Sequence, residues 1–389
     1  RTSSCSPSSP APWWGLGPDG VAGAFVSSEC NGCHSLSVDG SRLISQTVLT
    51  GGRSYALSSQ TTANPAGITA SPRSAYGALY PDGSKFFQTS IAIEVARAAL
   101  SSVGSATEAA LIDATTGNEV AGTGLPTQAL MPVFSPSGKW LAFNDFASGS
   151  GNNLTLMAYD TASDTASQAQ VVYTESAANM KPAWPFFLPD DKALIFARTD
   201  SLDFSGGAAG ILPDLPGPYS ELSILDLASG TATVLARAMG YATPADAASG
   251  TSYLPFGATE LHMSYYPTVS PVAAGGYFWV FFDALRHYGN LGLQRQLWGA
   301  AIEISPDGTY THDPSHPAFY LPGQEFGTGN HRAFAALDPC KMDGDKCTSG
   351  IDCCGGFCNI PEGATSEFGQ LPEGTCTEMP PRCSRRDER

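Results

Sequence analysis

The amino-acid sequence predicts an all-β chain that folds as a β-propeller of about six blades, within a range of five to seven, followed by a small disulfide-rich module. Three observations lead to this prediction. Charged residues make up only 14% of the 389 residues, while 42 are Gly and 29 are Pro, a mixture typical of many short strands joined by turns. A short phrase with a Pro-Asp-Gly-type turn recurs along the chain. Seven of the ten Cys residues lie between Cys340 and Cys383.

The recurrent phrase consists of apolar residues, the turn and a second apolar stretch, which is the chemistry of a β-hairpin. Further strand-like stretches follow several copies, such as residues 154–159 and 221–225. Four strands in each unit of roughly forty to fifty residues are typical of a propeller blade. The alternative is a β-sandwich with coincidental turns. The five copies begin at Ser35, Ala78, Val133, Phe186 and Thr268.

This phrase resembles the repeat of TolB-like β-propellers, whose blades carry a Ser-Pro-Asp-Gly-Lys hairpin. The resemblance covers about residues 33–338 and implies a propeller domain over residues 29–339. The long gap between the fourth and fifth copies leaves the number of blades open between five and seven.

Three other segments are expected to lie outside the blades. Residues 1–28 are predicted as an extended N-terminal arm, in which Trp13 and Trp14 pack onto the propeller. Segments 199–219 and 241–260 are rich in Gly, Pro and Ala and are predicted as inserted loops.

Residues 30–34 carry the pattern Cys-x-x-Cys-His, which is the attachment signature of haem c. The thiols of Cys30 and Cys33 can add to the two vinyl groups of one porphyrin, and His34 can then ligate the iron from one side. A single copy of the pattern predicts one covalent haem c. The alternatives are a disulfide between the two cysteines or half of a zinc site, which would need a second Cys/His pair at ligand spacing.

Alignment of the repeats locates this motif on the predicted propeller. The first strand of each blade lines the central channel, so equivalent positions in these strands should ring one mouth of the channel. Tyr76, Met131, Trp184 and Tyr266 are therefore predicted to form walls of the porphyrin site, although most of them could equally fill the channel mouth. His34 aligns with Gly77, Pro132, Pro185 and Pro267, and Cys33 aligns with Tyr76, Met131, Trp184 and Tyr266.

The sixth iron ligand is expected among His and Met residues outside the motif. His331 is preferred, because the end of the chain must meet its start where a propeller closes. His262 and Met263 are alternatives, followed by Met131 and Met180, and a vacant or externally filled position also stays open. His/Met ligation would raise the reduction potential relative to His/His, and an open position would allow peroxide chemistry.

The cysteine spacing of residues 340–389 resembles an inhibitor-cystine-knot (knottin) framework. Six cysteines alone permit 15 pairings. The framework uses six of the seven cysteines in this segment and leaves Cys383 unused. Cys5 is the only partner that remains for Cys383, so we expect a Cys5–Cys383 bridge. The segment is predicted as a docking or assembly module, or as a covalent staple against proteolysis. The resemblance implies the pairs Cys340–Cys354, Cys347–Cys358 and Cys353–Cys376.

The net charge of −16 argues against nucleic acid or an anionic membrane as a partner and favours redox partners with a basic docking face. Covalent haem and dense disulfides predict an exported bacterial protein of the periplasm or the extracellular space. No stretch of about 18 apolar residues is present, so no membrane span is expected. The first residue, Arg1, is followed by no apolar leader, as expected of a processed chain.

Together these features predict an exported monohaem c-type cytochrome that exchanges single electrons with redox proteins, as a homo-oligomer or in a larger assembly. An electron carrier is favoured over an enzyme because the cofactor carries the chemistry and no side chain need act as acid or base. A peroxidase-like haem enzyme and a binding or assembly protein with a structural haem are the alternatives, since propellers host many functions.

Overall fold

The computed structural model divides into two units, one formed by Arg1–Ala56 with Thr62–Ala336 and the other by Leu57–Thr61 with Leu337–Arg389. The structure describes residues 13–16, 22–26, 31–47, 51–56, 66–67, 76–91, 106–146, 151–177, 180–200, 219–254, 262–287, 295–324, 332–335, 344, 346–348, 353, 356–361 and 373–378.

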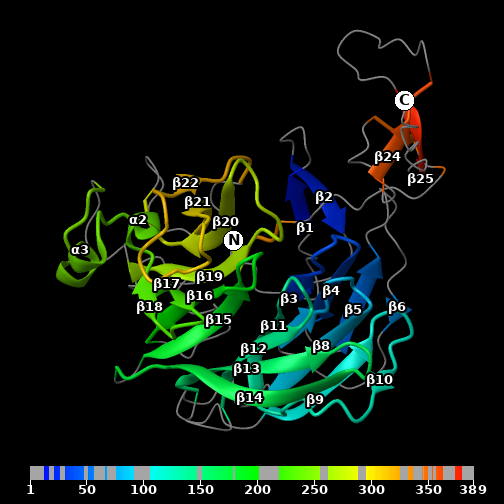
Figure 1. The fold of residues 1–389 in the computed structure, drawn as a ribbon, viewed down its shortest axis with the longest axis horizontal. Coiled ribbons are helices and arrows are strands. Elements are labelled where there is room, and N and C mark those ends of the chain that lie inside the picture. Colours follow the sequence, from blue (N-terminus) through cyan, green and yellow to red (C-terminus); the bar gives the residue numbers. More distant parts are fainter. Residues whose placement is uncertain are drawn as a thin grey trace, which may run out of the picture. The chain divides into compact units, whose positions relative to one another are not determined.

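The first unit is a β-propeller made of four-stranded antiparallel sheets, in which neighbouring strands follow each other in the chain (Figure 1). The described residues contain five such sheets, named blades 1 to 5. Blade 1 comprises β3 (Asn31–Leu36), β4 (Arg42–Thr47), β5 (Gly51–Ala56) and β6 (Ala66–Gly67); blade 2 comprises β7 (Tyr76–Leu79), β8 (Lys85–Ile91), β9 (Ala106–Asp113) and β10 (Glu119–Val120); blade 3 comprises β11 (Ala129–Phe134), β12 (Trp140–Asp145), β13 (Asn153–Asp160) and β14 (Thr165–Thr174); blade 4 comprises β15 (Lys181–Phe187), β16 (Ala193–Thr199), β17 (Ser220–Asp226) and β18 (Ala232–Val234); blade 5 comprises β19 (Ser264–Val269), β20 (Tyr277–Ala284), β21 (Gln296–Glu303) and β22 (Phe319–Tyr320).

The first strands of consecutive blades contact one another, β3 with β7, β7 with β11, β11 with β15 and β15 with β19. These contacts put the first strands at the axis, as in a propeller. The predicted all-β propeller is therefore confirmed. The five four-stranded sheets of the described residues lie within the expected range of five to seven.

The recurrent turn joins the first strand of a blade to its second. In the first three copies the turn glycine adopts a left-handed φ, 72° at Gly40, 70° at Gly83 and 73° at Gly138. The fourth copy has Asp191 at this position, with φ 59°. Aspartate tolerates the left-handed region better than most residues. The turn geometry is kept there, because the Asp191 N–H donates to the Leu188 carbonyl at 3.0 Å.

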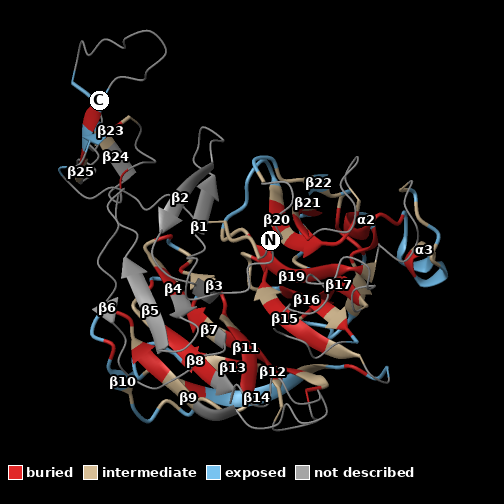
Figure 2. Ribbon diagram, turned by 180° about the vertical axis from the view of Figure 1, so that it is seen from behind, coloured by how far each residue is buried: buried red, intermediate tan, exposed pale blue. Residues whose placement is uncertain are grey.

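Apolar cores lie between neighbouring blades. Blades 4 and 5 share the largest one, which includes Ile195, Leu222, Val280 and Phe282, each 0% exposed. Figure 2 shows buried residues along the inner and middle strands of blades 3 to 5, whereas the outer strand β14 is mostly exposed. The sheet faces thus pack against each other around the axis, and the outermost strands meet solvent.

Two segments differ from the sequence predictions. The N-terminal arm contains an antiparallel hairpin of β1 (Trp13–Leu16) and β2 (Ala22–Val26). Between these strands the sequence is Gly-Pro-Asp-Gly-Val, which has the same turn chemistry as the blades. Segment 241–260, where a loop was expected, contains the short helix α3 (Pro244–Ser249), and a second short helix, α2 (Ala236–Met239), lies just before it.

Helix α3 has the local signals of a helix. Thr243 is its N-cap, whose side-chain oxygen accepts from the Asp246 N–H, and Pro244 occupies the first turn. Gly250 ends the helix in the left-handed conformation. The described helices are not long and apolar enough to cross a membrane.

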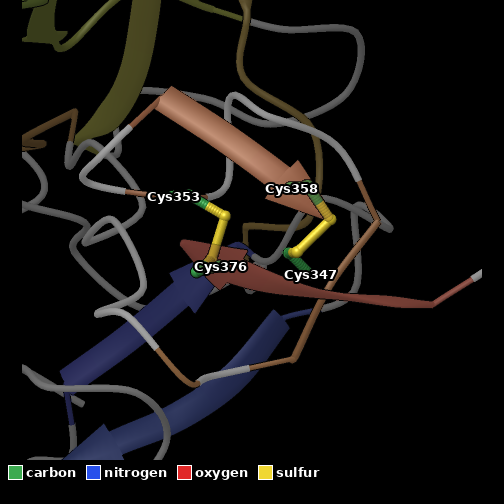
Figure 3. Close-up of a disulfide and its surroundings, with 4 residues drawn as sticks. All are labelled: Cys347, Cys353, Cys358 and Cys376. Atoms are coloured by element: carbon green, nitrogen blue, oxygen red, sulfur yellow. A yellow bond between two sulfur atoms is a disulfide. The ribbon is translucent and has the colours of Figure 1, made fainter. Parts of the chain in front are cut away.

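The second unit contains a three-stranded sheet in the order β23 (Lys346–Cys347), β25 (Gly374–Glu378), β24 (Gly356–Asn359). Disulfides join Cys347 to Cys358 and Cys353 to Cys376 around this sheet (Figure 3). Both pairings are among the three that the knottin resemblance implies. The expected pairs Cys340–Cys354 and Cys5–Cys383 lie outside the described residues. The disulfides indicate an oxidising environment for this chain.

Candidate functional site

Four of the five inner strands carry a β-bulge at one equivalent place. In blade 1 the register passes from Gly32 opposite Gln46 to Ser35 opposite Ile44, so that two residues, Cys33 and His34, lie opposite one. The same two-against-one arrangement occurs at Met131–Pro132, Trp184–Pro185 and Tyr266–Pro267. In blade 2 the strands pair regularly through Tyr76 and Gly77.

The register therefore agrees with the repeat alignment in four blades. In three of them the second bulge residue is a proline, which is tolerated there because a bulge interrupts the ladder hydrogen bonds that need an N–H. Blade 1 has His34 in place of the proline. The backbone of the Cys-x-x-Cys-His motif thus enters the first blade at its bulge.

The first bulge residue adopts a left-handed backbone conformation in three blades. The φ angle is 50° at Met131, 55° at Trp184 and 51° at Tyr266. Such angles are unfavourable for residues with a Cβ and persist where the surroundings impose them. All three side chains are buried, with exposed fractions of 3%, 7% and 5%, respectively.

These three side chains belong to one apolar cluster, here named the mouth cluster. The Trp184 and Tyr266 rings meet edge to face, with their centroids 4.9 Å apart. The cluster consists of Leu130, Met131, Ala183, Trp184, Met263, Tyr265, Tyr266 and Leu285, with Phe146 packed against it. Three of the predicted porphyrin walls, Met131, Trp184 and Tyr266, are thus brought together with Met263, and both Met131 and Met263 are alternative iron ligands.

Two arginines border the mouth cluster. Arg295 lies over the Tyr265 ring at 4.7 Å and the Tyr266 ring at 5.5 Å, and it forms an ion pair with the buried Asp283 at 2.9 Å. Arg332 lies over the Trp184 ring at 4.3 Å. Neither arginine could be identified as a site residue from the sequence, because an isolated Arg is not part of any recognisable motif.

The segment 332–335 returns to the propeller axis. The Ala333 carbonyl accepts from the Thr268 hydroxyl at 2.6 Å, and the Phe334 ring lies 6.3 Å from that of Phe186. The chain therefore runs beside the inner strands of blades 4 and 5. His331, the preferred distal ligand, precedes this segment and lies outside the described residues, as does Cys30. The side chains of Cys33 and His34 are also not described.

His262, the other alternative ligand, has both ring nitrogens facing polar groups. Its Nε2 is hydrogen-bonded to the Tyr241 hydroxyl at 3.0 Å, and its Nδ1 lies 3.7 Å from Glu221 Oε2. Its ring stacks on Tyr219 at 4.4 Å. Burial lowers the pKa of His262, and Glu221 opposes this effect only in part. To ligate iron, His262 would have to give up the contact of one of these ring nitrogens.

A chain of charged side chains, of which the two carboxylates are buried, continues from His262. Arg198 binds both Glu221 and Glu175, and its Nε donates to Glu175 Oε2 at 2.7 Å. The Tyr173 and Tyr219 hydroxyls donate to the two carboxylates at 2.8 Å each. His262 thus belongs to a polar network that joins blades 3 and 4, whereas Met263 belongs to the mouth cluster.

The residue opposite the bulge distinguishes blade 1 from the others. In blades 3, 4 and 5 the single opposite residue is Phe143, Phe196 or Phe282, each at most 1% exposed. In blade 1 the register gives Ser45 at this place. The three phenylalanines pack in the apolar cores between blades, whereas Met131, Trp184 and Tyr266 belong to the mouth cluster.

The sequence matches no model of a known protein family, and none of the curated proteins matches it. Among solved structures, hydrazine synthase of Kuenenia stuttgartiensis is 15% identical with a TM-score of 0.36, over 70% of this chain and 63% of that one. A putative TolB of Agrobacterium tumefaciens is 12% identical with a TM-score of 0.41, over 76% of this chain and 82% of that one. TolB of Acinetobacter baumannii is 14% identical with a TM-score of 0.40, over 77% of this chain and 60% of that one. This chain thus spans less than two thirds of the hydrazine synthase and the Acinetobacter TolB chains, and similarities at this level concern the fold alone.

Proposed function

We propose that this chain is a monohaem c-type cytochrome, exported to the periplasm or the extracellular space, that transfers single electrons to and from redox proteins. The observation that carries the proposal is the position of the Cys-x-x-Cys-His motif. Its last two residues, Cys33 and His34, form a bulge equivalent to three others whose side chains gather in the mouth cluster. A cofactor attached there would lie beside thioether and aromatic side chains.

The residues present suit haem c. Cys30 and Cys33 would form the two thioether bonds, and His34 would be the proximal iron ligand. Met131, Trp184 and Tyr266 offer a buried apolar surface that excludes water from a porphyrin. The bound haem would supply reversible one-electron chemistry at iron.

Two residues are the leading candidates for the distal ligand. His331 is supported by its neighbour Arg332, which stacks on Trp184 of the mouth cluster. Met263 is supported by its own position in that cluster, where it is 6% exposed. His262 is less suited, because both of its nitrogens face polar partners.

The first experiment tests for covalent haem. The protein is produced in a host with cytochrome c maturation, and intact mass and a pyridine haemochrome spectrum are recorded. We expect one haem per chain, retained after denaturation, and its loss in the double variant Cys30→Ala, Cys33→Ala. A wild-type chain of unmodified mass, or a Cys30–Cys33 disulfide found by peptide mapping, would overturn the proposal.

A second experiment identifies the distal ligand. A methionine–iron charge-transfer band in the oxidised protein that disappears in Met263→Leu would assign Met263. A bis-histidine spectrum that becomes high-spin in His331→Ala would assign His331. Rapid carbon monoxide binding by the wild type would show an open position and support the peroxidase-like alternative over a simple electron carrier.

The net charge of the chain indicates the kind of redox partner that it would bind. The net charge of −16 suits docking to a redox protein with a basic face, which would make electron transfer sensitive to ionic strength. Reduction rates with a basic and an acidic donor protein of similar potential test this directly. We expect the basic donor to react faster at low salt and to lose that advantage as salt is added.

A further inference from the structure

Arg286, two residues after the end of β20, is a buried cation with a side chain that is only 3% exposed. Its guanidinium carbon lies 4.8 Å from the centre of the Trp298 ring and 5.4 Å from that of the Phe282 ring. Its Nη2 donates to the Ala238 carbonyl of α2 at 3.2 Å and to the Ser264 hydroxyl of β19 at 3.4 Å. Residues of blade 5 and of α2 therefore enclose this guanidinium.

No carboxylate balances the charge of Arg286 within the part of the chain that the structure describes. Burial lowers the pKa of Arg286 to about 10, and the nearby ionisable groups that oppose this effect are the phenols of Tyr253 and Tyr241. Both phenols are uncharged at neutral pH, because burial raises the pKa of each. This situation is unusual, since buried charges in proteins are normally paired with an opposite charge.

The guanidinium also has a hydrogen-bond donor without an acceptor. The Nε atom of Arg286 is covered by protein atoms, and none of the described residues accepts a hydrogen bond from it. A buried donor without an acceptor is costly, and a buried cation without an anion is more costly still. The faces of the two aromatic rings recover only part of this cost. One anion beside Nε would satisfy the donor and neutralise the charge.

Two other arginines of the propeller show how this chain balances such a charge. Burial would lower the pKa of Arg295, but the Asp283 carboxylate at 2.9 Å outweighs burial and raises the pKa above its usual value. Arg198 binds two glutamates. At Arg286 none of the described side chains has this role, which leaves an anion from solution as the balancing charge.

We propose that Arg286 binds a chloride ion through its Nε, with the Ser264 hydroxyl as a second donor. The Ser264 oxygen accepts from Nη2, so its hydrogen can point toward the ion. A small anion with a single charge suits this place, because Ala238, Ser264 and Phe282 are fully buried and a doubly charged oxyanion is larger and costlier to desolvate. The ion would fasten α2 to blade 5, and this role does not depend on the proposed haem.

The first test measures unfolding in sodium chloride and in sodium gluconate at equal ionic strength. Gluconate screens charges equally but is too large for a buried halide site. At a chloride concentration of about ten times the dissociation constant, the equilibrium constant for unfolding should fall about tenfold. Sodium bromide should act like sodium chloride. Because the net charge of the chain is −16, loose binding of chloride to the surface is not expected to imitate this saturable effect.

Three variants assign the effect to Arg286. Arg286→Met removes the charge and keeps an unbranched side chain, whereas Arg286→Lys keeps a charge and loses the Nε donor. Arg237→Met removes an exposed arginine of α2 and is the matched control. We expect the dependence on chloride to disappear in Arg286→Met, to need a severalfold higher chloride concentration in Arg286→Lys, and to remain unchanged in Arg237→Met.

A wild-type crystal grown in sodium bromide locates the ion without any substitution. We expect an anomalous peak in contact with the Arg286 Nε, and this measurement decides the point alone if Arg286→Met does not fold. The proposal is overturned by unfolding that shows no saturable dependence on chloride, by a dependence that persists in Arg286→Met, or by the absence of an anomalous peak beside Nε. Stabilisation by sodium acetate but not by chloride would also overturn it and assign the site to a small carboxylate.

Discussion

The indole of Trp184 and the phenol ring of Tyr266 meet edge to face at the propeller axis, with their centroids 4.9 Å apart. Each is the first bulge residue of its own blade, and each has a left-handed φ. The contact therefore joins two strained positions from neighbouring blades. Burial of both rings offsets the backbone cost of these conformations.

Trp184 is expected to stabilise the folded propeller whether or not a haem is bound. Trp184→Ala should lower the free energy of unfolding by about 3–5 kcal/mol, because it leaves a cavity in the mouth cluster. Trp184→Phe should have a smaller effect, since the edge-to-face contact with Tyr266 can persist. Denaturant unfolding measures both changes. Phe319→Ala, at a residue 44% exposed, is the control, and an equal effect there would contradict the assignment.

Glu175 makes stability dependent on pH. Burial would raise its pKa, but bonds from Arg198, the Ala177 N–H and Tyr173 outweigh burial and hold the pKa below its usual 4.5. A carboxyl group with a lowered folded-state pKa stabilises the fold above its unfolded pKa, and this contribution disappears as pH falls through the folded value. Stability should therefore decrease below about pH 4.5.

Glu175→Gln tests this dependence. At neutral pH the variant should be less stable by about 1–3 kcal/mol, because the buried partners lose a charged acceptor. The difference from the wild type should shrink as pH falls toward 3 in urea unfolding series. Exposed Glu119→Gln serves as the control. A constant difference at all pH values would argue against the role of the Glu175 charge.

The two disulfides of the second unit should contribute unequally to its free energy of unfolding. Cys353–Cys376 joins residues 23 apart and Cys347–Cys358 residues 11 apart, so the first restrains a loop about twice as long. Each should stabilise by about 3 kcal/mol, with a difference of about 0.6 kcal/mol in favour of the longer loop. Paired Cys→Ser variants and rates of limited proteolysis between residues 337 and 389 measure this. Faster cleavage after loss of the shorter bridge would contradict the ranking.

Much of the fold could be predicted from the sequence, because each turn is specified by residues that are neighbours in the chain. Pro-Asp-Gly chemistry specifies a hairpin within a few residues, so the copies at Ser35 through Thr268 were visible without any long-range information. The alignment of Cys33 with Met131, Trp184 and Tyr266 likewise followed from spacing alone. Two disulfides agree with the pairing that the resemblance to a knottin framework implies.

Other features depend on contacts between distant segments. The stacking of Arg332 on Trp184 joins the end of the propeller to blade 4. The partners of His262 come from β17 and from the residues after α2. No local pattern encodes such pairs. The short helix α3 could have been found from its cap, Thr243-Pro244 with Asp246, but its Gly- and Ala-rich surroundings suggested a loop.

The bulges carry different side chains at equivalent positions of the inner strands. Each bulge sets two residues outside the regular ladder, so their side chains can be exchanged while the sheet register on either side is kept. Blade 2, which pairs regularly through Gly77, shows that a blade can also do without a bulge. A scaffold of this kind can acquire a cofactor by altering a few residues of one blade, and the remaining blades need only provide its surroundings.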